Sequence, residues 1–415
     1  MTPGLQHLVR QVHGSPVMLA YAFMGAGPLA LEWLRDVDES SRTVLEAHDW
    51  RASRGVLGPV SGSPSNGTPT VDHAAVPDAA GELALESYRR ARDLAPGGVA
   101  AVGVGCAARV ANDAAPDALR ACVVVHGALG RHVLTLAVRH VERERRELEL
   151  LVSTVVVHAI ATGCGVLHRG RPALRPGETL EERFEPARRL AEVLGGQRTH
   201  VVLTRAGELE AGVPRLVGGI AIVSGSFNPL HEGHLGLAAA AQRHLQLPTV
   251  FELARRTVTK ATLEPLELYE RATQFYGRAT LVITDAARFS EKAAIYPGSV
   301  FVLGADTVAR MVSRRCPDDH GLRVAMSGVR INRCRFLVAG RQRLAGGTAP
   351  ARVERGADAP EATIEVGSAP FVTLADLDVP PRYADLFEAL PEEVFRSDVS
   401  SSHIRDRSGP SPLDL

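Results

Sequence analysis

One segment constrains the fold of this chain more than any other. A short apolar run at 219–223 leads into the loop Ser224-Gly-Ser-Phe-Asn-Pro-Leu-His-Glu-Gly-His234, and an alanine-rich helical pattern follows at 235–245. This order predicts a buried strand, a tight loop and the start of a helix. Because the first N–H groups of a helix attract anions, the two histidines, three residues apart, stand where an anion can bind.

A second motif lies near the C-terminus, in the segment Val399-Ser-Ser-Ser-His-Ile-Arg405. Ser400, Ser401 and Ser402 offer hydroxyl and backbone N–H donors at a predicted helix start, and Arg405 can fork onto a phosphate group. Two such segments in one chain indicate nucleotide chemistry.

Composition limits the remaining possibilities. The chain has 415 residues, more than one ordinary core contains, so two domains are expected. Its 47 basic and 47 acidic residues give a formal net charge of zero, which argues against a nucleic-acid partner held by broad counterion release. The five cysteines form no CxxC pair, so we expect neither a disulfide framework nor a zinc site, and we expect a cytoplasmic location.

Neither a signal peptide nor a membrane span is predicted. The N-terminus lacks a charged region followed by a clean apolar segment. The longest apolar stretch, 150–167, is interrupted by polar residues and glycines, and it is expected to be a buried core element. No membrane partner is therefore expected.

Residues 1–167 are predicted to form a first, smaller α/β domain. Apolar runs alternate there with helical patterns, including a strand at 99–104 and helices at 82–94 and 143–160. The segment 58–70 is rich in Gly, Ser and Pro and is expected to be a loop.

Residues 168–215 are predicted to connect this domain to a second one. They contain a charged pattern at 179–194, predicted to be a helix broken or kinked at Pro186, and a hairpin signal at Ala206-Gly207. From 216 to 415 strands alternate with helices, which favours a doubly wound parallel sheet. Residues 342–368 are expected to be a surface insertion.

The two motifs resemble, in order and separation, the signatures of the HxGH nucleotidylyltransferases of the cytidylyltransferase-like superfamily. The resemblance covers roughly residues 216 to 415 and implies a Rossmann-like domain that moves a nucleotidyl group to an acceptor and releases pyrophosphate. Such a transfer needs no covalent enzyme intermediate, so positioning and electrostatic stabilisation carry the catalysis.

The resemblance implies roles for individual residues. His231, His234 and Arg405 would be catalytic. The residues that would bind the nucleotide phosphates are Gly225, Ser226, Phe227, Ser400, Ser401 and Ser402. ATP would arrive with Mg²⁺, and no metal-ligating residues are predicted. A zinc-protease interpretation of the two histidines fails, because that motif places them four residues apart.

The acceptor is predicted from a further resemblance. Phe301-Val-Leu-Gly-Ala-Asp306 is similar to the IGxD stretch of nicotinamide mononucleotide adenylyltransferases, which implies that mononucleotide as acceptor and a part in NAD biosynthesis. Lys260, Arg271 and Asp306 would then bind the acceptor, although Asp306 also fits a helix N-cap. Two other acceptors stay open, either phosphopantetheine or a cytidylyl acceptor. A nucleotide-binding regulatory protein with little turnover also stays open as an alternative function.

The use of lysine is unusual. Of 47 basic residues only Lys260 and Lys292 are lysines, which suggests positions that need a compact ammonium group able to reach a phosphate. The alternative is chance retention on a solvated face, and the sequence assigns Lys292 no role.

The N-terminal residues resemble the C-terminal domain of the CinA family, which includes nicotinamide-nucleotide amidases. The resemblance covers about residues 5 to 165, with 20–26 in place of the family's AESCTGG run and 102–107 in place of its ITGxAGP turn. The family's serine, threonine and tyrosine fall on Ala22, Met24 and Trp50. Because an alanine cannot act as a nucleophile, this domain is predicted to be catalytically inactive. We also expect the protein to form a homo-oligomer.

Overall fold

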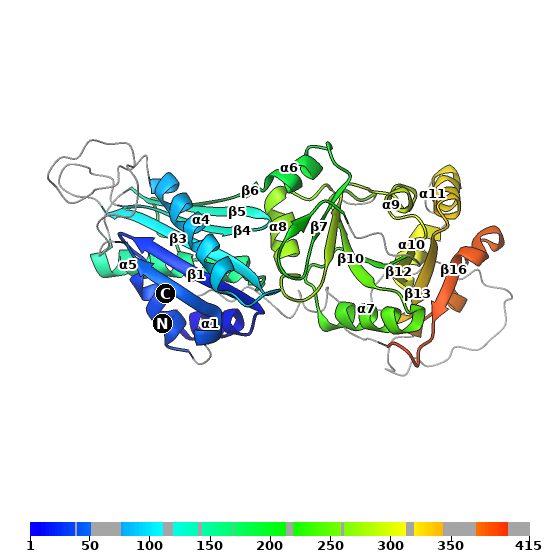
Figure 1. Ribbon diagram of the computed structural model, residues 1–415, viewed down its shortest axis with the longest axis horizontal. Coiled ribbons are helices and arrows are strands. Elements are labelled where there is room, and N and C mark those ends of the chain that lie inside the picture. The colour runs from blue at the N-terminus through cyan, green and yellow to red at the C-terminus, as the bar shows by residue number, and fades with distance from the viewer. Residues whose placement is uncertain are drawn as a thin grey trace, which may run out of the picture. The chain divides into compact units, whose positions relative to one another are not determined.

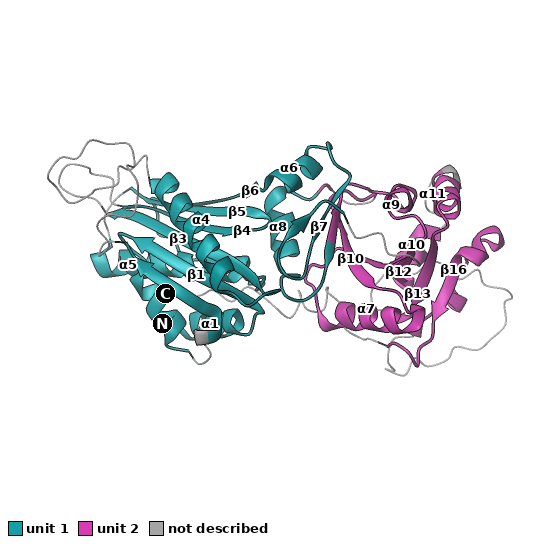
Figure 2. Cartoon of the chain, in the orientation of Figure 1, with its two compact units in different colours: residues 1–212, 263–281, 405–415 teal, residues 213–262, 282–404 magenta. Residues whose placement is uncertain are grey.

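The computed structural model describes residues 1–37, 40–50, 76–110, 119–139, 143–168, 170–212, 219–258, 261–312, 319–342 and 371–396. The chain divides into two compact units (Figure 2). The described residues of unit 1 fall in 1–212 and 263–281, and those of unit 2 in 213–262 and 282–404. Both units are mixed α/β structures, as predicted, and no helix of the described residues is long and apolar enough to cross a membrane.

Unit 1 is built on a six-stranded sheet with the order β2-β1-β3-β4-β5-β6 (Figure 1). The strands are β1 (Val17–Met24), β2 (Val44–Asp49), β3 (Ala100–Val110), β4 (Leu119–Gly127), β5 (Gly130–Val138) and β6 (Glu178–Pro186). β1 pairs in parallel with β2 and β3, whereas β3 to β6 run antiparallel to one another. The helices of unit 1 are α1 (Pro3–His13), α2 (Pro28–Arg35), α3 (Ser40–Thr43), α4 (Val76–Leu94), α5 (Arg145–Gly163), α6 (Arg188–Leu194) and α8 (Pro265–Thr273).

Helices cover both faces of this sheet. On one face Ala80 and Ala84 of α4 pack against Cys122 and Val124 of β4. Val125, which points the other way because side chains alternate along a strand, meets α5 on the opposite face. α5 is buried over most of its length, which confirms the prediction of a core helix in this apolar stretch.

Two expectations for the first 212 residues are wrong. Residues 178–186 form strand β6, which pairs with β5 from Gly130↔Pro186 to Val138↔Glu178, and only 188–194 are helical. Burial alternates along β6, the pattern of a sheet edge with one covered face, and this two-residue period outweighs the charged helical pattern. The hairpin near Gly207 is confirmed as β7 (His200–Leu203) and β8 (Leu209–Glu210).

The second error concerns residues 102–107, where the CinA resemblance implied a turn, whereas the strand that the apolar run predicted at 99–104 is confirmed. β3 runs through Gly103 and Gly105 without interruption. A Cβ on Gly103 would stand 2.0 Å from the backbone nitrogen of Tyr88, and one on Gly105 would stand 2.3 Å from the carbonyl oxygen of Ala80. The glycines are therefore needed because helix α4 lies directly on the strand.

Unit 2 contains the doubly wound sheet that the sequence predicted. Its strands are β9 (Ala221–Ser224), β10 (Thr249–Ala254), β11 (Leu281–Thr284), β12 (Val300–Gly304), β13 (Arg335–Ala339) and β16 (Phe387–Leu390), with a small antiparallel pair, β14 (Arg341–Gln342) and β15 (Phe371–Val372). Its helices are α7 (Glu232–Leu245), α9 (Phe289–Ile295), α10 (Ala305–Val312) and α11 (Asp319–Ile331), with short 3-10 turns at Leu374–Asp376 and Pro381–Leu386.

The strand order of unit 2 is β16-β13-β12-β9-β10-β11. β9 pairs in parallel with β10 on one side and with β12 on the other, and β12, β13 and β16 continue in parallel. Numbered along the chain, this is the 3-2-1-4-5-6 order of a Rossmann-type sheet, whose ligands bind where the order reverses. The reversal lies between β9 and β12.

We predict that Gly103→Ala destabilises unit 1 strongly, because its Cβ meets helix backbone that cannot move aside without separating α4 from β3. The free energy of unfolding should fall by about 2 kcal/mol or more, as expected for overpacking against backbone. Urea denaturation of the purified protein measures this change.

Gly97→Ala is the matched control, since a Cβ at Gly97 has no atom within 4 Å. This variant should unfold at the urea concentration of the unchanged protein. Equal stability of the two variants would contradict the packing argument.

Candidate functional site

The loop 224–231 lies at the point where the sheet order reverses. It follows β9, whose neighbours β10 and β12 end at the same edge of the sheet, and it leads into α7. The N–H of Gly225 donates to the carbonyl oxygen of Glu252 at 3.1 Å, so the loop begins on a fixed backbone position of β10. The predicted order of strand, loop and helix is confirmed.

Phe227 shapes the loop from inside. Its φ is +44°, and its side chain is fully buried against Phe251 and His234, with ring centroids 5.5 and 5.1 Å apart. A Cβ on Gly225 would lie 2.7 Å from the Phe227 ring, so the glycine makes room for this aromatic side chain. Of Phe227 only the backbone is therefore available to a phosphate group.

The two histidines form a stacked pair at the start of α7. His231 is the N-cap residue and His234 lies in the first turn, and their rings are 3.8 Å apart between centroids at an angle of 28°. The backbone N–H of His231 donates to Nδ1 of His234 at 3.3 Å. Because that nitrogen accepts a hydrogen bond, the neutral ring of His234 carries its proton on Nε2.

Both imidazoles are held in the neutral form. Burial lowers the pKa of His234 to about 3, with further lowering from His231 and from Arg341. Burial and then the charge of Arg341 also lower the pKa of His231. Both ring nitrogens of His231 are buried and have no hydrogen-bond partner among the described residues, which leaves a donor and an acceptor for a bound molecule.

Asp306 and Arg341 lie at the ends of the neighbouring strands. Asp306 is in the first turn of α10, directly after β12, and is not the N-cap residue that the sequence also allowed. Its Oδ2 lies 3.3 Å from Nη1 of Arg341 and 3.3 Å from Nη2 of Arg310. Arg341 was not predicted, although it follows the apolar run 336–339, and a basic residue just after such a run is a signal that could have identified it.

The predicted site residues divide into three groups. Unit 2 brings together around the end of β9 the residues Gly225, Ser226, Phe227, His231 and His234, and it places Asp306 after the adjacent strand. Arg271 belongs to α8 of unit 1, where it forms an ion pair with Glu267. Outside the described residues lie Lys260, Ser400, Ser401, Ser402 and Arg405. The roles of all these residues stay predictions.

Lys292 has a structural explanation. Its Nζ lies 2.7 Å from Oε2 of Glu252, and the two side chains are 8% and 1% exposed. Thr284 donates its hydroxyl to Oε1 of the same carboxylate at 2.5 Å, and the ammonium group lies 5.1 Å from the centre of the Phe289 ring. Lys292 is therefore neither on a solvated face nor directed at a phosphate in this structure.

Unit 1 shows no activated nucleophile at the position of the family's serine. Ala22 is buried within β1, and the nearby thiol of Cys106 is also buried, which raises its pKa well above the usual range. A cavity of about 550 Å³ lies at the end of β1, lined in part by Gly25, Ala26 and Glu149. The CinA resemblance and the inactivity of this domain stay predictions.

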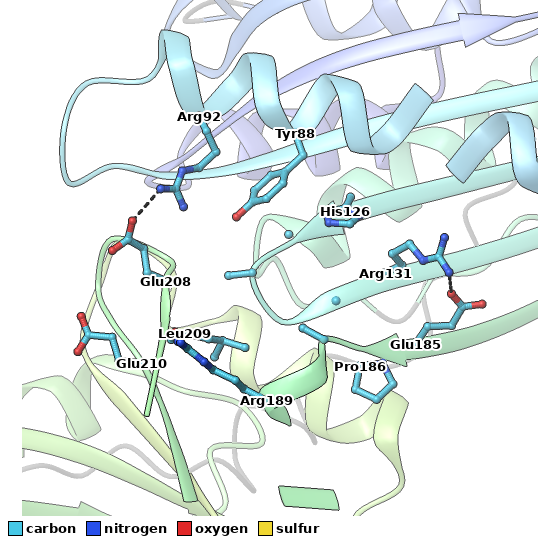
Figure 3. A pocket seen from close by; sticks show the side chains of 14 residues that line it. Tyr88, Arg92, His126, Arg131, Glu185, Pro186, Arg189, Glu208, Leu209 and Glu210 are labelled. Atoms are coloured by element: carbon cyan, nitrogen blue, oxygen red, sulfur yellow. Dashed lines mark hydrogen bonds and ion pairs between the residues drawn. The ribbon is translucent and has the colours of Figure 1, made fainter. Parts of the chain in front are cut away.

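A larger cavity of about 670 Å³ also lies in unit 1 (Figure 3). Tyr88 and Arg92 of α4 point into it from one side, and Nη2 of Arg92 is 2.7 Å from Oε1 of Glu208. Three arginines and three glutamates line its walls, so their formal charges cancel. This cavity contains none of the predicted transfer residues, and we therefore place the candidate site at the end of β9 instead.

Comparison with known proteins identifies a family for this part of the chain. Residues 222–407 match the family model described as Cytidylyltransferase-like, and a search of curated proteins found no match. The matched segment begins within β9 and includes both predicted motifs. It supports the nucleotidylyltransferase superfamily for this part of the chain, and a nucleotidyl-transfer function in general.

We predict that Lys292→Met destabilises the protein by about 3–5 kcal/mol, because the carboxylate of Glu252 stays buried without its cation. The double variant Glu252→Gln, Lys292→Met should regain much of this loss, since it removes both charges. Urea denaturation of the two variants tests the pair. A single variant as stable as the unchanged protein would show that the ion pair is not a buried one.

We also predict that His234 stays neutral down to about pH 4. In the unfolded chain an imidazole takes up a proton near pH 6.5. Because the folded pKa is about 3, the unfolded state binds more protons in between, and the contribution of His234 to stability falls as the pH drops from 6.5 towards 3. Histidine NMR spectra recorded from pH 8 to pH 4, with His234→Asn for assignment, test this. A titration midpoint near 6.5 would refute it.

Proposed function

We propose that this protein is a nucleotidylyltransferase that moves AMP from ATP to nicotinamide mononucleotide, giving the dinucleotide and pyrophosphate. The observation that carries the proposal is the stacked, neutral pair His231 and His234 at a helix start, on the strand-order reversal of a Rossmann-type sheet. The Cytidylyltransferase-like match over 222–407 supports nucleotidyl transfer in general.

In the proposed reaction a phosphate oxygen of the acceptor attacks the α-phosphorus of ATP. The new bond forms as the bond from the α-phosphorus to the bridging oxygen breaks, and pyrophosphate leaves with that electron pair. Negative charge grows on the α-phosphate oxygens during this step. N–H groups that are already aimed at these oxygens stabilise the charge without reorganising.

The histidines suit this task because they are neutral and hydrogen-bond donors at once. Nε2–H of His234 and the partnerless ring of His231 can donate to the α-phosphate oxygens. A bound triphosphate raises the pKa of both rings, because a nearby anion favours the imidazolium form. The resemblance adds Ser402 and Arg405 on the leaving pyrophosphate and Lys260 on the acceptor side.

Magnesium would enter with the nucleotide. Among the described residues no group of three or more His, Cys, Asp and Glu side chains could hold a metal ion. Carboxylates are the usual protein ligands of Mg²⁺, and Oδ2 of Asp306 lies 3.3 Å from both Arg310 and Arg341. We propose that the ion is carried on the phosphate oxygens of ATP, where it would neutralise charge.

The acceptor distinguishes this proposal from its alternatives. Asp306 after β12, in the Gly-Ala-Asp stretch, supports the mononucleotide. We expect the purified protein with Mg²⁺ and ATP to release pyrophosphate in the presence of nicotinamide mononucleotide, in a coupled pyrophosphate assay. Release with phosphopantetheine alone, or with CTP and a cytidylyl acceptor, would replace the proposed acceptor. ATP binding without release from any acceptor would favour a nucleotide-binding regulator.

His234→Ala serves as the catalytic control in the same assay. Loss of one donor that is aimed at the developing charge lowers turnover by about 10²–10³-fold. Turnover at the unchanged rate in a folded variant would remove the proposed role of this ring.

A further inference from the structure

We infer that Arg341 binds the phosphate chain of the nucleoside triphosphate in the transfer site, and that Asp306 holds its guanidinium group until the phosphate arrives. The inference rests on the proposed function and names the cation that receives its triphosphate. Arg341 lies outside both sequence motifs.

The need for a cation follows from the charge of the loop. Between Ser224 and Gly236 the ionisable side chains are His231, Glu232 and His234. Both imidazoles are neutral, so the loop itself has a formal charge of −1, whereas a triphosphate carries three to four negative charges. Arg341 is a candidate because its guanidinium lies 3.3 Å from Asp306, which directly follows β12, the strand beside β9, and its charge lowers the pKa of both histidines.

The backbone of Arg341 is fixed on the sheet edge. Arg341 begins β14 and pairs with Val372 of β15, two residues after β13 ends. A Cβ on the preceding Gly340 would lie 2.3 Å from the ring of Phe371, so this glycine lets β15 close over the turn. The backbone position of Arg341 is therefore defined. It lies just after β13, the strand that neighbours β12 on the side opposite β9.

The carboxylate of Asp306 also has a defined position. A Cβ on Gly304 would lie 2.8 Å from Oδ1 of Asp306, so a larger residue there would push the carboxylate away. That oxygen is buried and has no hydrogen-bond partner among the described residues, while Oδ2 lies 3.3 Å from Arg341. The carboxylate can hold the guanidinium, yet it is not saturated by it.

The pair is weak enough to open. Its separation exceeds the roughly 2.7–2.9 Å of a strong charge-assisted hydrogen bond, and the two side chains are 36% and 39% exposed. Ion pairs with this exposure contribute little to stability. A phosphate group, which accepts two parallel N–H bonds from one guanidinium, can therefore displace Asp306.

Isothermal titration with inorganic triphosphate, and separately with ATP, tests the inference. Arg341→Ala should bind triphosphate about 10–100-fold more weakly, the range for losing a hydrogen bond to a charged group. Asp306→Asn should bind it more tightly, by a few-fold, because the competing carboxylate is gone. Arg341→Lys should fall between Arg341→Ala and the unchanged protein.

Arg310→Ala is the matched control. Arg310 also contacts Asp306, and its side chain is 71% exposed. Its loss should change triphosphate binding by less than about twofold. An equal loss in Arg310→Ala and Arg341→Ala would overturn the inference, as would unchanged binding in Arg341→Ala or no binding of triphosphate by the unchanged protein.

A second readout is independent of turnover. In the free protein, Arg341→Ala should raise the pKa of His234 in NMR titrations, because a repelling charge is removed. An unchanged pKa would show that Arg341 does not face the histidines and would overturn the inference. If triphosphate binding depends on Arg341 but no acceptor releases pyrophosphate, the inference stands and the proposed function fails.

Discussion

The buried residue Glu252 is the constraint on which the candidate site at the end of β9 depends. The side chain of Glu252 is buried and contacts Lys292 and Thr284, while the backbone carbonyl oxygen of Glu252 accepts a hydrogen bond from the N–H of Gly225. Through this one residue, strand β10 forms an ion pair to α9 and accepts the first hydrogen bond of the loop that follows β9. A buried ion pair offsets its desolvation only when its geometry is good, so the pair fixes where α9, β10 and β11 meet.

From this fixed point the loop has little freedom. Gly225 must be a glycine because Phe227 folds back over it, and Phe227 packs in turn against His234. The stacked histidines are therefore positioned by an aromatic core, not by polar contacts. The same burial lowers the pKa of both rings and keeps them neutral, so each ring can donate a hydrogen bond without adding a formal positive charge.

The transfer loop was predictable because its signals are local. An apolar run, a glycine-containing loop and an alanine-rich helical pattern follow one another, and α7 begins where that order places it. Asp306 was singled out from the IGxD resemblance; it lies in the first turn of α10, directly after β12, and its role stays a prediction. Arg341 was not predicted because its place beside Asp306 depends on strand order, which sets β9, β12 and β13 next to one another although they are far apart in the sequence. The burial that keeps the histidines neutral likewise cannot be predicted from the motif alone.

Strand β6 was predicted wrongly because its local sequence signals indicate a helix. Its sequence, Glu178 to Pro186, has the charge content of an exposed helix, and only its pairing with β5 reveals a strand. At the glycines of β3 the apolar run predicted the strand and only the CinA resemblance implied a turn, because packing under α4 and a tight turn demand the same residue. A tertiary contact decided each case, and no window of local sequence contains it.

The use of lysine gains a physical meaning at one of its two positions. In a chain with 45 arginines among 47 basic residues, Lys292 occupies a place where the described contacts offer one carboxylate oxygen and an aromatic face. A guanidinium group would bring five N–H donors and more volume into this buried space, and most of the donors would lack partners. An ammonium group fits because it is a compact charge. The argument from composition thus identified a residue that needs to be lysine, but the cause is burial beside Glu252 and not contact with a phosphate.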